Sequence, residues 1–262
     1  MSAAPGAGLP HHRLDGPEGA PAIVLGNALG TDLTTWDAVA ARLEPTHRVL
    51  RYDHRGQGRS GALPGPESIE QLGRDVLALL DANGIEHAAY CGISLGGMVG
   101  LWLAAEAPAR IDSLVALCSS AHPGGEEAWR RRAAIVTKAG STRPIAEGVV
   151  ARWPTAEAAA ADPELVARLE EMLRATPPVG YSACCMVLAS LDLREALRRI
   201  AVPTLVVGAD QDEALPPAHS REIAAGIAAS RLEIMEPAAH LPIIERPDAV
   251  AALILGHLGA AS

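Results

Sequence analysis

The sequence predicts an α/β protein in which a mostly parallel β-sheet is covered by helices on both faces and a helical cap is inserted between two strands. Two observations predict this class. Short apolar runs alternate with longer amphipathic segments, and this alternation stops between residues 124 and 200 before it resumes. At 262 residues, the chain is near the upper limit for one hydrophobic core, so one domain with an insertion fits better than two domains.

Six short runs are predicted to be strands. They are almost continuously apolar, which is typical of strands buried on both faces of a parallel sheet. The runs cover residues 22–27, 47–53, 87–93, 113–119, 203–209 and 231–237. Between the second and third runs, residues 68–84 place their Ile, Leu and Val side chains on one helical stripe that closes at Gly84. The last predicted helix covers residues 247–258.

The region that interrupts the alternation is predicted to be helical. Its pattern has short breaks that begin at Ser or Pro residues, at 141–144, Pro154, Pro163 and 177–180. We therefore expect a core formed by residues 1–123 and 201–262, with residues 124–200 as a helical cap.

The charge and cysteine content exclude several classes of protein. Lys and Arg number 22 against 31 Asp and Glu, and the resulting net charge of −9 repels nucleic acid. The first residues, MSAAPGAGLPHH, resemble no export signal, and no apolar run reaches the roughly 18 residues of a membrane span. Four cysteines show neither zinc-site spacing nor the density of a disulfide scaffold. We expect a cytoplasmic protein with no nucleic-acid or membrane partner.

The segment GISLGG, residues 92–97, is the strongest local signal for chemistry. It directly follows a predicted strand and directly precedes a helical pattern. Gly92 and Gly96 flank Ser94 because a tight turn between strand and helix leaves no room for side chains. Ser94 would then lie at a helix N-terminus, where backbone N–H groups favour a developing oxyanion. Ser94 is therefore the candidate nucleophile.

A serine hydroxyl needs a base to remove its proton, so a histidine must come from elsewhere in the chain. His240 is the candidate, since it follows the predicted strand 231–237 in a loop where open α/β sheets place their ligands. The other histidines fall at strand starts, in turns or on predicted surface helices, at positions 11, 12, 47, 54, 87, 122, 219 and 257. An acid must then orient His240. The loop after strand 203–209 offers Asp210, Asp212 and Glu213.

Two backbone N–H groups are candidates for the oxyanion hole. One belongs to Leu95, the residue after the nucleophile, and the other to Leu29, in the loop that follows the first predicted strand. Residues 52–60, YDHRGQGRS, have a glycine spacing like that of a dinucleotide fingerprint, but no opening helix follows them. We therefore do not interpret this segment as a dinucleotide site.

With these residues in place, residues 23–258 resemble the α/β-hydrolase superfamily, and within it the 3-oxoadipate enol-lactonases. The elbow and the His240 loop are common to many hydrolases. The lactonase resemblance depends on NALGTDLTTW, GVVARWPT and PELVARLEEMLRATPPVGY. Two positions depart from it: Ala28 stands where the lactonases more often have Ser, and Pro154 where an aromatic residue is usual.

The resemblance implies a serine hydrolase that opens 3-oxoadipate enol-lactone to 3-oxoadipate in aromatic catabolism, without a metal or cofactor. It favours Asp212 as the acid, because that residue stands four positions before Pro216. The lactone carries a carboxylate, so a cap cation beside an aromatic wall is expected to bind it. The candidates are Trp129, Arg132, Arg152 and Trp153.

Three other interpretations stay open at this point. The same triad serves other ester or lactone hydrolases and cofactor-free perhydrolases, and a hydrolase fold can also act as a small-molecule receptor without turnover. The sequence does not set the number of subunits, and a homo-oligomer is one option.

Overall fold

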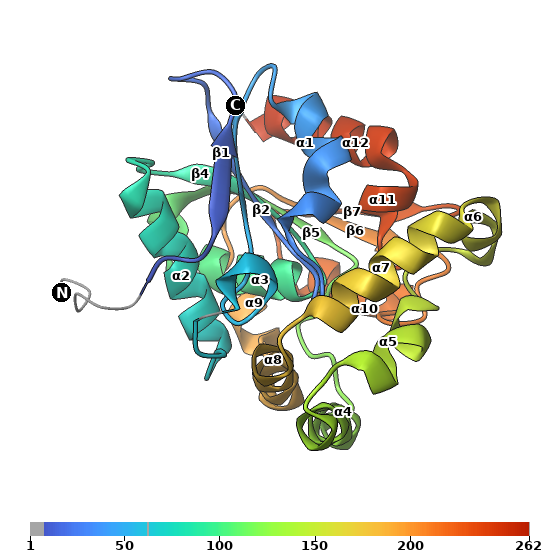
Figure 1. Cartoon of the computed structure of the whole chain (residues 1–262). Coiled ribbons are helices and arrows are strands. Elements are labelled where there is room, and N and C mark those ends of the chain that lie inside the picture. Colours follow the sequence, from blue (N-terminus) through green and yellow to red (C-terminus); the bar gives the residue numbers. More distant parts are fainter. Residues whose placement is uncertain (1–7, 62, 262) are drawn as a thin grey trace.

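A seven-stranded sheet forms the centre of the computed structural model, which describes residues 8–61 and 63–261 (Figure 1). The first seven residues, part of the segment in which we expect no export signal, lie outside the described residues. The strand order is β1-β3-β2-β4-β5-β6-β7. The strands are β1 His12–Asp15, β2 Ala22–Gly26, β3 Arg48–Tyr52, β4 Ala88–Ile93, β5 Ile111–Leu117, β6 Thr204–Ala209 and β7 Ser230–Met235. All neighbours pair in parallel except β1 and β3, so the predicted fold class is confirmed.

Helices cover both faces of the sheet, as the sequence predicts. On one face α1 packs against α12, and on the other α2 packs against α3. The helices of this core are α1 Asp37–Leu43, α2 Ile69–Ala82, α3 Leu95–Glu106, α9 Arg194–Leu197, α10 Pro217–Gly226, α11 Pro242–Glu245 and α12 Pro247–Ala261. No helix in the described part of the chain combines the length and apolarity that a membrane crossing requires.

All six helices between β5 and β6 in the described chain, α9 included, fall in the region expected to form the cap. The other five are α4 Glu126–Ala139, α5 Arg143–Val150, α6 Ala156–Ala161, α7 Pro163–Ala175 and α8 Pro178–Ser190. Each predicted break lies at or beside an observed one, but residues 143–144, Pro163 and residues 178–180 belong to the first turns of α5, α7 and α8, and a further break separates α8 from α9. α9 packs against α3 and α10 of the core. Because β5 lies between β4 and β6 in the sheet, the inserted helices leave and rejoin the core beside the end of β4.

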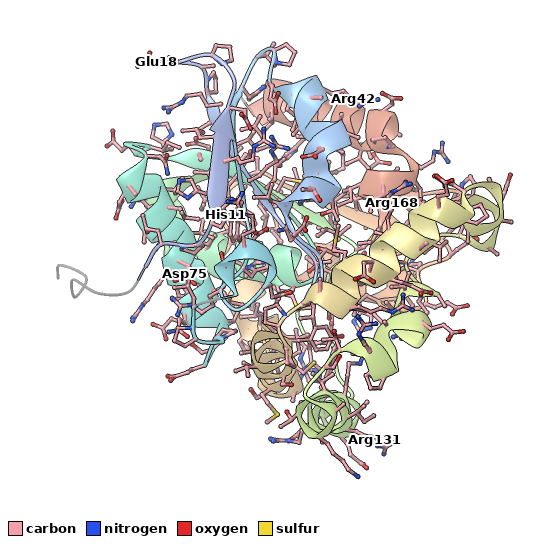
Figure 2. The ribbon with its side chains drawn as sticks, viewed as in Figure 1. His11, Glu18, Arg42, Asp75, Arg131 and Arg168 are labelled. Carbon is pink, nitrogen blue, oxygen red and sulfur yellow. The ribbon has the colours of Figure 1, made fainter. Side chains whose placement is uncertain are left out.

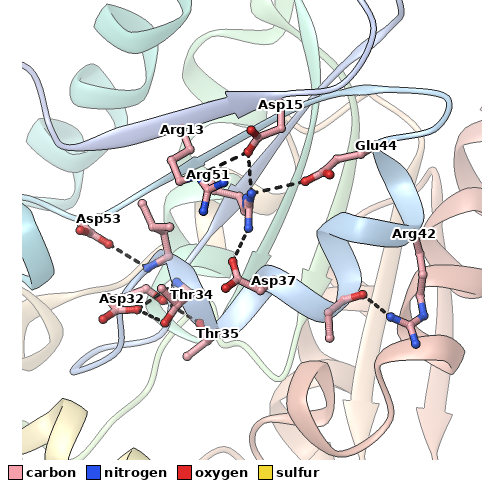
Figure 3. Close-up of polar contacts among 12 residues, drawn as sticks. Arg13, Asp15, Asp32, Thr34, Thr35, Asp37, Arg42, Glu44, Arg51 and Asp53 are labelled. Carbon is pink, nitrogen blue, oxygen red and sulfur yellow. Dashed lines mark hydrogen bonds and ion pairs between the residues drawn. The ribbon is translucent and has the colours of Figure 1, made fainter.

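Strand β1 is the element that the sequence analysis missed. Its four residues, HRLD, are short, polar and only partly buried, so they lack the apolar run expected of a sheet strand. β1 is held by Arg51 of β3, whose buried guanidinium pairs with Asp15 at 2.6 Å. Arg51 also pairs with Asp37 and Glu44 (Figure 3). The antiparallel pairing with β3 and the Asp15–Arg51 ion pair therefore attach this edge strand, while Asp37 and Glu44 hold the Arg51 side chain in place.

The loop between β3 and α2 is fastened to the core by a buried ion pair. Arg55 donates from Nε to Asp75 of α2 at 2.6 Å and makes a second bond to the same carboxylate. Asp75 and the nearby Glu67 raise the pKa of Arg55. A bidentate pair of this kind fixes both partners in one geometry, so it sets the path of residues 52–60.

Removal of one partner of this pair should therefore be costly. We expect Asp75→Ala to lower the free energy of unfolding by about 3 to 5 kcal/mol, since it leaves a buried guanidinium without its counterion. Glu70→Ala on the same helix is the control, because the Glu70–Arg74 pair is exposed and should contribute less than about 1 kcal/mol. Urea unfolding of both variants measures the difference, and equal losses would contradict this role for Asp75.

Candidate active site

The structure brings Ser94, His240 and Asp212 together at the carboxyl edge of the sheet. Ser94 follows β4, Asp212 follows β6 and His240 follows β7. Nε2 of His240 lies 3.0 Å from Oγ of Ser94, and Nδ1 lies 2.8 Å from Oδ2 of Asp212. The side chains of His240 and Asp212 are 5% and 0% exposed. With Nδ1–H donated to Asp212, Nε2 is free to accept the Ser94 proton, which is the arrangement that activates a serine hydroxyl.

The backbone at Ser94 holds the hydroxyl away from the sheet. Ser94 has φ of 54° and ψ of −117°, a conformation that costs an ordinary residue about 1 to 3 kcal/mol. The two flanking glycines make the turn possible. A Cβ at Gly92 would lie 2.3 Å from the Gly96 backbone, and one at Gly96 would lie 2.3 Å from the Gly26 carbonyl oxygen. The glycine spacing noted in the sequence thus has a steric cause.

Asp212 and Asp210 occupy the same loop but have different partners. Oδ1 of Asp212 accepts from the N–H groups of Ala214 and Leu215, at 2.8 and 2.9 Å, which leaves Oδ2 aimed at His240. Oδ1 of Asp210 accepts instead from the N–H of Ala238 at 2.9 Å. Asp210 therefore fastens the start of the His240 loop, and Asp212 is the acid in contact with the imidazole.

The two expected oxyanion donors lie beside Ser94. Leu95 opens helix α3, and Leu29 lines the same cavity as Ser94. The N–H of Gly96 donates to the carbonyl of Asn27 at 2.8 Å, which joins the loop after β2 to the first turn of α3. Within the described residues, the Leu29 and Leu95 N–H groups donate to no protein acceptor. Both are therefore available to a ligand.

The 52–60 segment, set aside in the sequence analysis, holds the Leu29 loop. Oε1 of Gln57 accepts from the Gly30 N–H at 2.7 Å, and the Gln57 side chain is fully buried. His54 donates from Nε2 to the Asn27 carbonyl at 3.0 Å. Burial lowers the pKa of His54 to about 4, so the ring is neutral at pH 7. The glycine spacing of residues 52–60 indicated an ordered loop. It did not indicate that this loop contacts the Leu29 loop.

The residues predicted to bind substrate all face Ser94. Trp129, Arg132, Arg152 and Trp153 line a cavity of about 40 Å³ together with Ser94 and His240. The guanidinium of Arg132 lies 4.7 Å from the centre of the Trp129 ring, within the range of a cation–π interaction.

The two arginines of this cavity are unusual in their charge environment. Neither forms an ion pair with a carboxylate in the described part of the chain. The neighbouring Arg130 and Arg131 pair with Glu126 and Glu127 on the outer face of α4. Burial lowers the pKa of Arg152, and the charge of Arg132 lowers it further. Two half-buried cations that repel each other create a site for an anion.

Tyr181 is a cavity residue that the sequence analysis did not single out. Its side chain is fully buried and lines the cavity, and its hydroxyl has no partner with hydrogen-bond geometry. Burial raises the pKa of Tyr181, an effect that the charge of Arg132 opposes. An unpaired buried hydroxyl is costly unless a ligand satisfies it. The sequence did contain a signal for Tyr181, because this residue ends PELVARLEEMLRATPPVGY, one of the segments that carry the resemblance to the lactonases.

Metal-ligating side chains are dispersed in this structure. The His, Cys, Asp and Glu side chains of residues 8–61 and 63–261 form no group of three or more that could hold a metal ion. The four cysteines are buried and unpaired. Burial raises the pKa of each thiol, so none is set up as a thiolate ligand or nucleophile.

The fold and this site define an α/β-hydrolase, and the chain belongs to that family. A family model described as "alpha/beta hydrolase fold" matches residues 21–247. Within the family, the chain is 39% identical over 229 residues to 3-oxoadipate enol-lactonase 2 of Acinetobacter baylyi, with 87% of this chain and 85% of that protein covered. The resemblance to the enol-lactonases is thus confirmed.

Solved structures agree with this placement. An enol-lactonase from Burkholderia xenovorans LB400 superposes with a TM-score of 0.92 at 39% identity, over 95% of this chain and 96% of that one. A thermophilic esterase from Thermogutta terrifontis superposes with a TM-score of 0.88 at 27% identity, over 96% and 93% of the two chains. The protein is an ester or lactone hydrolase.

The contacts of the two aspartates predict unequal losses on substitution. Asp212→Asn should lower kcat by roughly 10⁴, because an amide at this position favours the wrong His240 tautomer. Asp210→Asn should have a small effect, since its amide oxygen still accepts from the Ala238 N–H. Steady-state kinetics at neutral pH on any hydrolysed ester compares the two variants. A greater loss in Asp210→Asn would reverse the assignment.

Proposed function

We propose that this hydrolase opens 3-oxoadipate enol-lactone to 3-oxoadipate, a late step of aromatic-compound breakdown. The observation that carries the proposal is the pair of unpaired cations, Arg132 and Arg152, in the cavity that contains Ser94. The 39% identity to a 3-oxoadipate enol-lactonase supports the same substrate. The lactone carries a carboxylate outside its ring, and an anion of this kind is what two cations beside a nucleophile can bind.

The environment of the two arginines explains how the enzyme would recognise the carboxylate of the substrate. A carboxylate loses its hydration when it enters an apolar cavity. It therefore needs a cation or several N–H donors there to replace the lost water. Arg132 is held against Trp129, and Arg152 and Trp153 line the same cavity, so both charges lie beside aromatic side chains. The guanidinium plane suits a two-oxygen partner better than a lysine would. The substrate is therefore oriented by its carboxylate at one end and by the oxyanion donors at the other.

In the first half of the reaction, Oγ of Ser94 attacks the lactone carbonyl carbon while Nε2 of His240 takes the hydroxyl proton. Asp212 stabilises the imidazolium that forms. The carbonyl oxygen becomes an oxyanion, which the N–H groups of Leu29 and Leu95 stabilise. The ring C–O bond then breaks to leave an acyl-enzyme. Its enol oxygen takes the proton from His240, and the enol tautomerises to the ketone.

In the second half, His240 removes a proton from a water molecule that attacks the acyl-enzyme carbonyl. A second oxyanion forms at the same donors, the bond to Ser94 Oγ breaks, and His240 returns its proton to Ser94. The product is 3-oxoadipate, which carries two carboxylates where the lactone carried one. His240 carries the protons of attack, ring opening and deacylation, and the released enol exchanges its protons with water as it becomes the ketone.

Turnover of the enol-lactone is the direct test, followed as loss of its absorbance. In the same assay, Ser94→Ala should lower kcat on the order of 10⁶-fold, because the nucleophile is lost and only binding and the oxyanion donors stay. Circular dichroism and melting of the variant serve as the control for folding. Retention of more than about a tenth of the wild-type rate would mean that Ser94 is not the nucleophile.

A second prediction separates recognition of the carboxylate from general catalysis. Arg132→Ala and Arg152→Ala should each cost about 2 to 5 kcal/mol in kcat/KM on the carboxylated lactone, because the substrate anion is left unpaired. They should change little on a neutral lactone of equal size. Arg130→Ala is the matched control, since Arg130 lies on the outer face of α4 and pairs with Glu126. Equal losses on the two lactones would remove the main support for the enol-lactone.

A further inference from the structure

As the structure shows it, the cavity at Ser94 is too small for the proposed enol-lactone substrate. A space of about 40 Å³ holds only about three water molecules, and an enol-lactone of ten non-hydrogen atoms needs more. One wall must therefore move when substrate enters. Most of the wall is rigid, because Met98, Trp153, Tyr181 and Leu188 are at most 3% exposed and belong to the buried core.

Another part of the wall, formed by the buried Val149 and the half-buried Arg132 and Arg152, adjoins a second hollow. Arg132, Val149 and Arg152 line the Ser94 cavity and also a groove of about 290 Å³ on the outside of the cap. This α4–α5 groove lies between helices α4 and α5, which pack side by side (Figure 1). Ala128, Ile135 and Ile145 form its apolar surface. Among the described residues, these three side chains are the lining that the groove and the Ser94 cavity share.

Three arginines line the groove of a protein whose net charge is negative, and of these Arg131 is paired with Glu127. Arg131, Arg132 and Arg152 line it, whereas the whole chain has a net charge of −9. Arg131, in the middle of α4, points outward from the helix (Figure 2), and its side chain is 70% exposed. A cluster of like charges in a hollow raises the local concentration of the opposite ion. Long arginine side chains can also swing aside without disturbing the helices that carry them.

We propose that the α4–α5 groove is the access route to Ser94 for an anionic, carboxylate-bearing substrate, with Arg132 and Arg152 as the movable wall between groove and cavity. This inference rests on the proposed function for its anionic substrate. The apolar surface receives the ring, and the arginines receive the carboxylate as they turn. The same two charges thus attract the substrate and hold it in place.

Gly148 offers a way to close the groove without contact with the cavity. It is exposed, it lines the groove, and a Cβ at this position would meet no atom within 4 Å. Gly148→Trp should fill the groove and lower kcat/KM on the order of tenfold or more, within the range over which association rates vary among variants. The control is Gly256→Trp, at an equally open and exposed helical glycine on α12, which should keep the wild-type value.

Two substrates make the test independent of the proposed function. p-Nitrophenyl acetate reports on access to Ser94 for any ester hydrolase, and the enol-lactone reports on the proposed substrate. A fall on both in Gly148→Trp alone supports the route, whereas wild-type kcat/KM on both overturns it. If the wild-type enzyme hydrolyses only the acetate, the proposed function fails while the ester still tests the groove.

A charge reversal at Arg131 tests whether the positive charge of the groove attracts the anionic substrate. Arg131→Glu should lower kcat/KM on the carboxylated lactone several-fold at low salt, and the deficit should shrink as salt screens the charge. p-Nitrophenyl acetate, which is neutral, should be unaffected. Arg130→Glu is the matched control, since Arg130 is the next residue on α4 but does not line the groove. Equal effects of the two reversals would overturn the role of the groove charge.

Discussion

The contact between Gly96 and the chain at Gly26 and Asn27 is the constraint on which the rest of the site depends. The Gly96 N–H donates to the Asn27 carbonyl, and the backbones approach so closely that no Cβ fits between them. This contact sets the turn at Ser94 and the position of the Leu29 loop together. A nucleophile and an oxyanion donor from distant parts of the sequence are thereby fixed relative to each other, which preorganises the site before substrate binds.

The cap is joined to this arrangement through the His240 loop. The N–H of Leu241 donates to the Trp153 carbonyl, and Glu245 accepts from the N–H groups of Thr155 and Ala239. The wall of the substrate cavity and the loop of the imidazole therefore share one set of hydrogen bonds. Leu241, which is hydrogen-bonded to Trp153, directly follows His240, so a displacement of Trp153 would also move His240. This coupling is the reason that cap substitutions can change turnover as well as binding.

Local sequence was sufficient where the chemistry imposes a local pattern. The glycines around Ser94 and the apolar run before it are adjacent in the chain, so the turn could be predicted without tertiary information. The choice between Asp210 and Asp212 could not be made from the residues alone, because it depends on which one the β7 loop meets. Gln57 was missed for the same reason, since its partner Gly30 is distant in sequence. Tyr181 was missed because only the packing of the folded chain places it in the Ser94 cavity. Strand β1 was missed because it has no apolar run: its pairing with β3 and the Asp15–Arg51 ion pair attach it to the sheet.

The charge distribution of the cap reflects a conflict between stability and binding. Paired to carboxylates of the chain, as Arg130 and Arg131 are, Arg132 and Arg152 would contribute to the fold but could not receive an anion. Left unpaired, they repel each other at the edge of an apolar cavity, which is a cost in the free enzyme. The field of Asp212 and Glu213, which acts to raise the pKa of Arg152, reduces that cost without neutralising the site. A bound carboxylate would remove the rest of the repulsion between the two arginines. The repulsion that destabilises the empty cavity therefore favours binding of an anion.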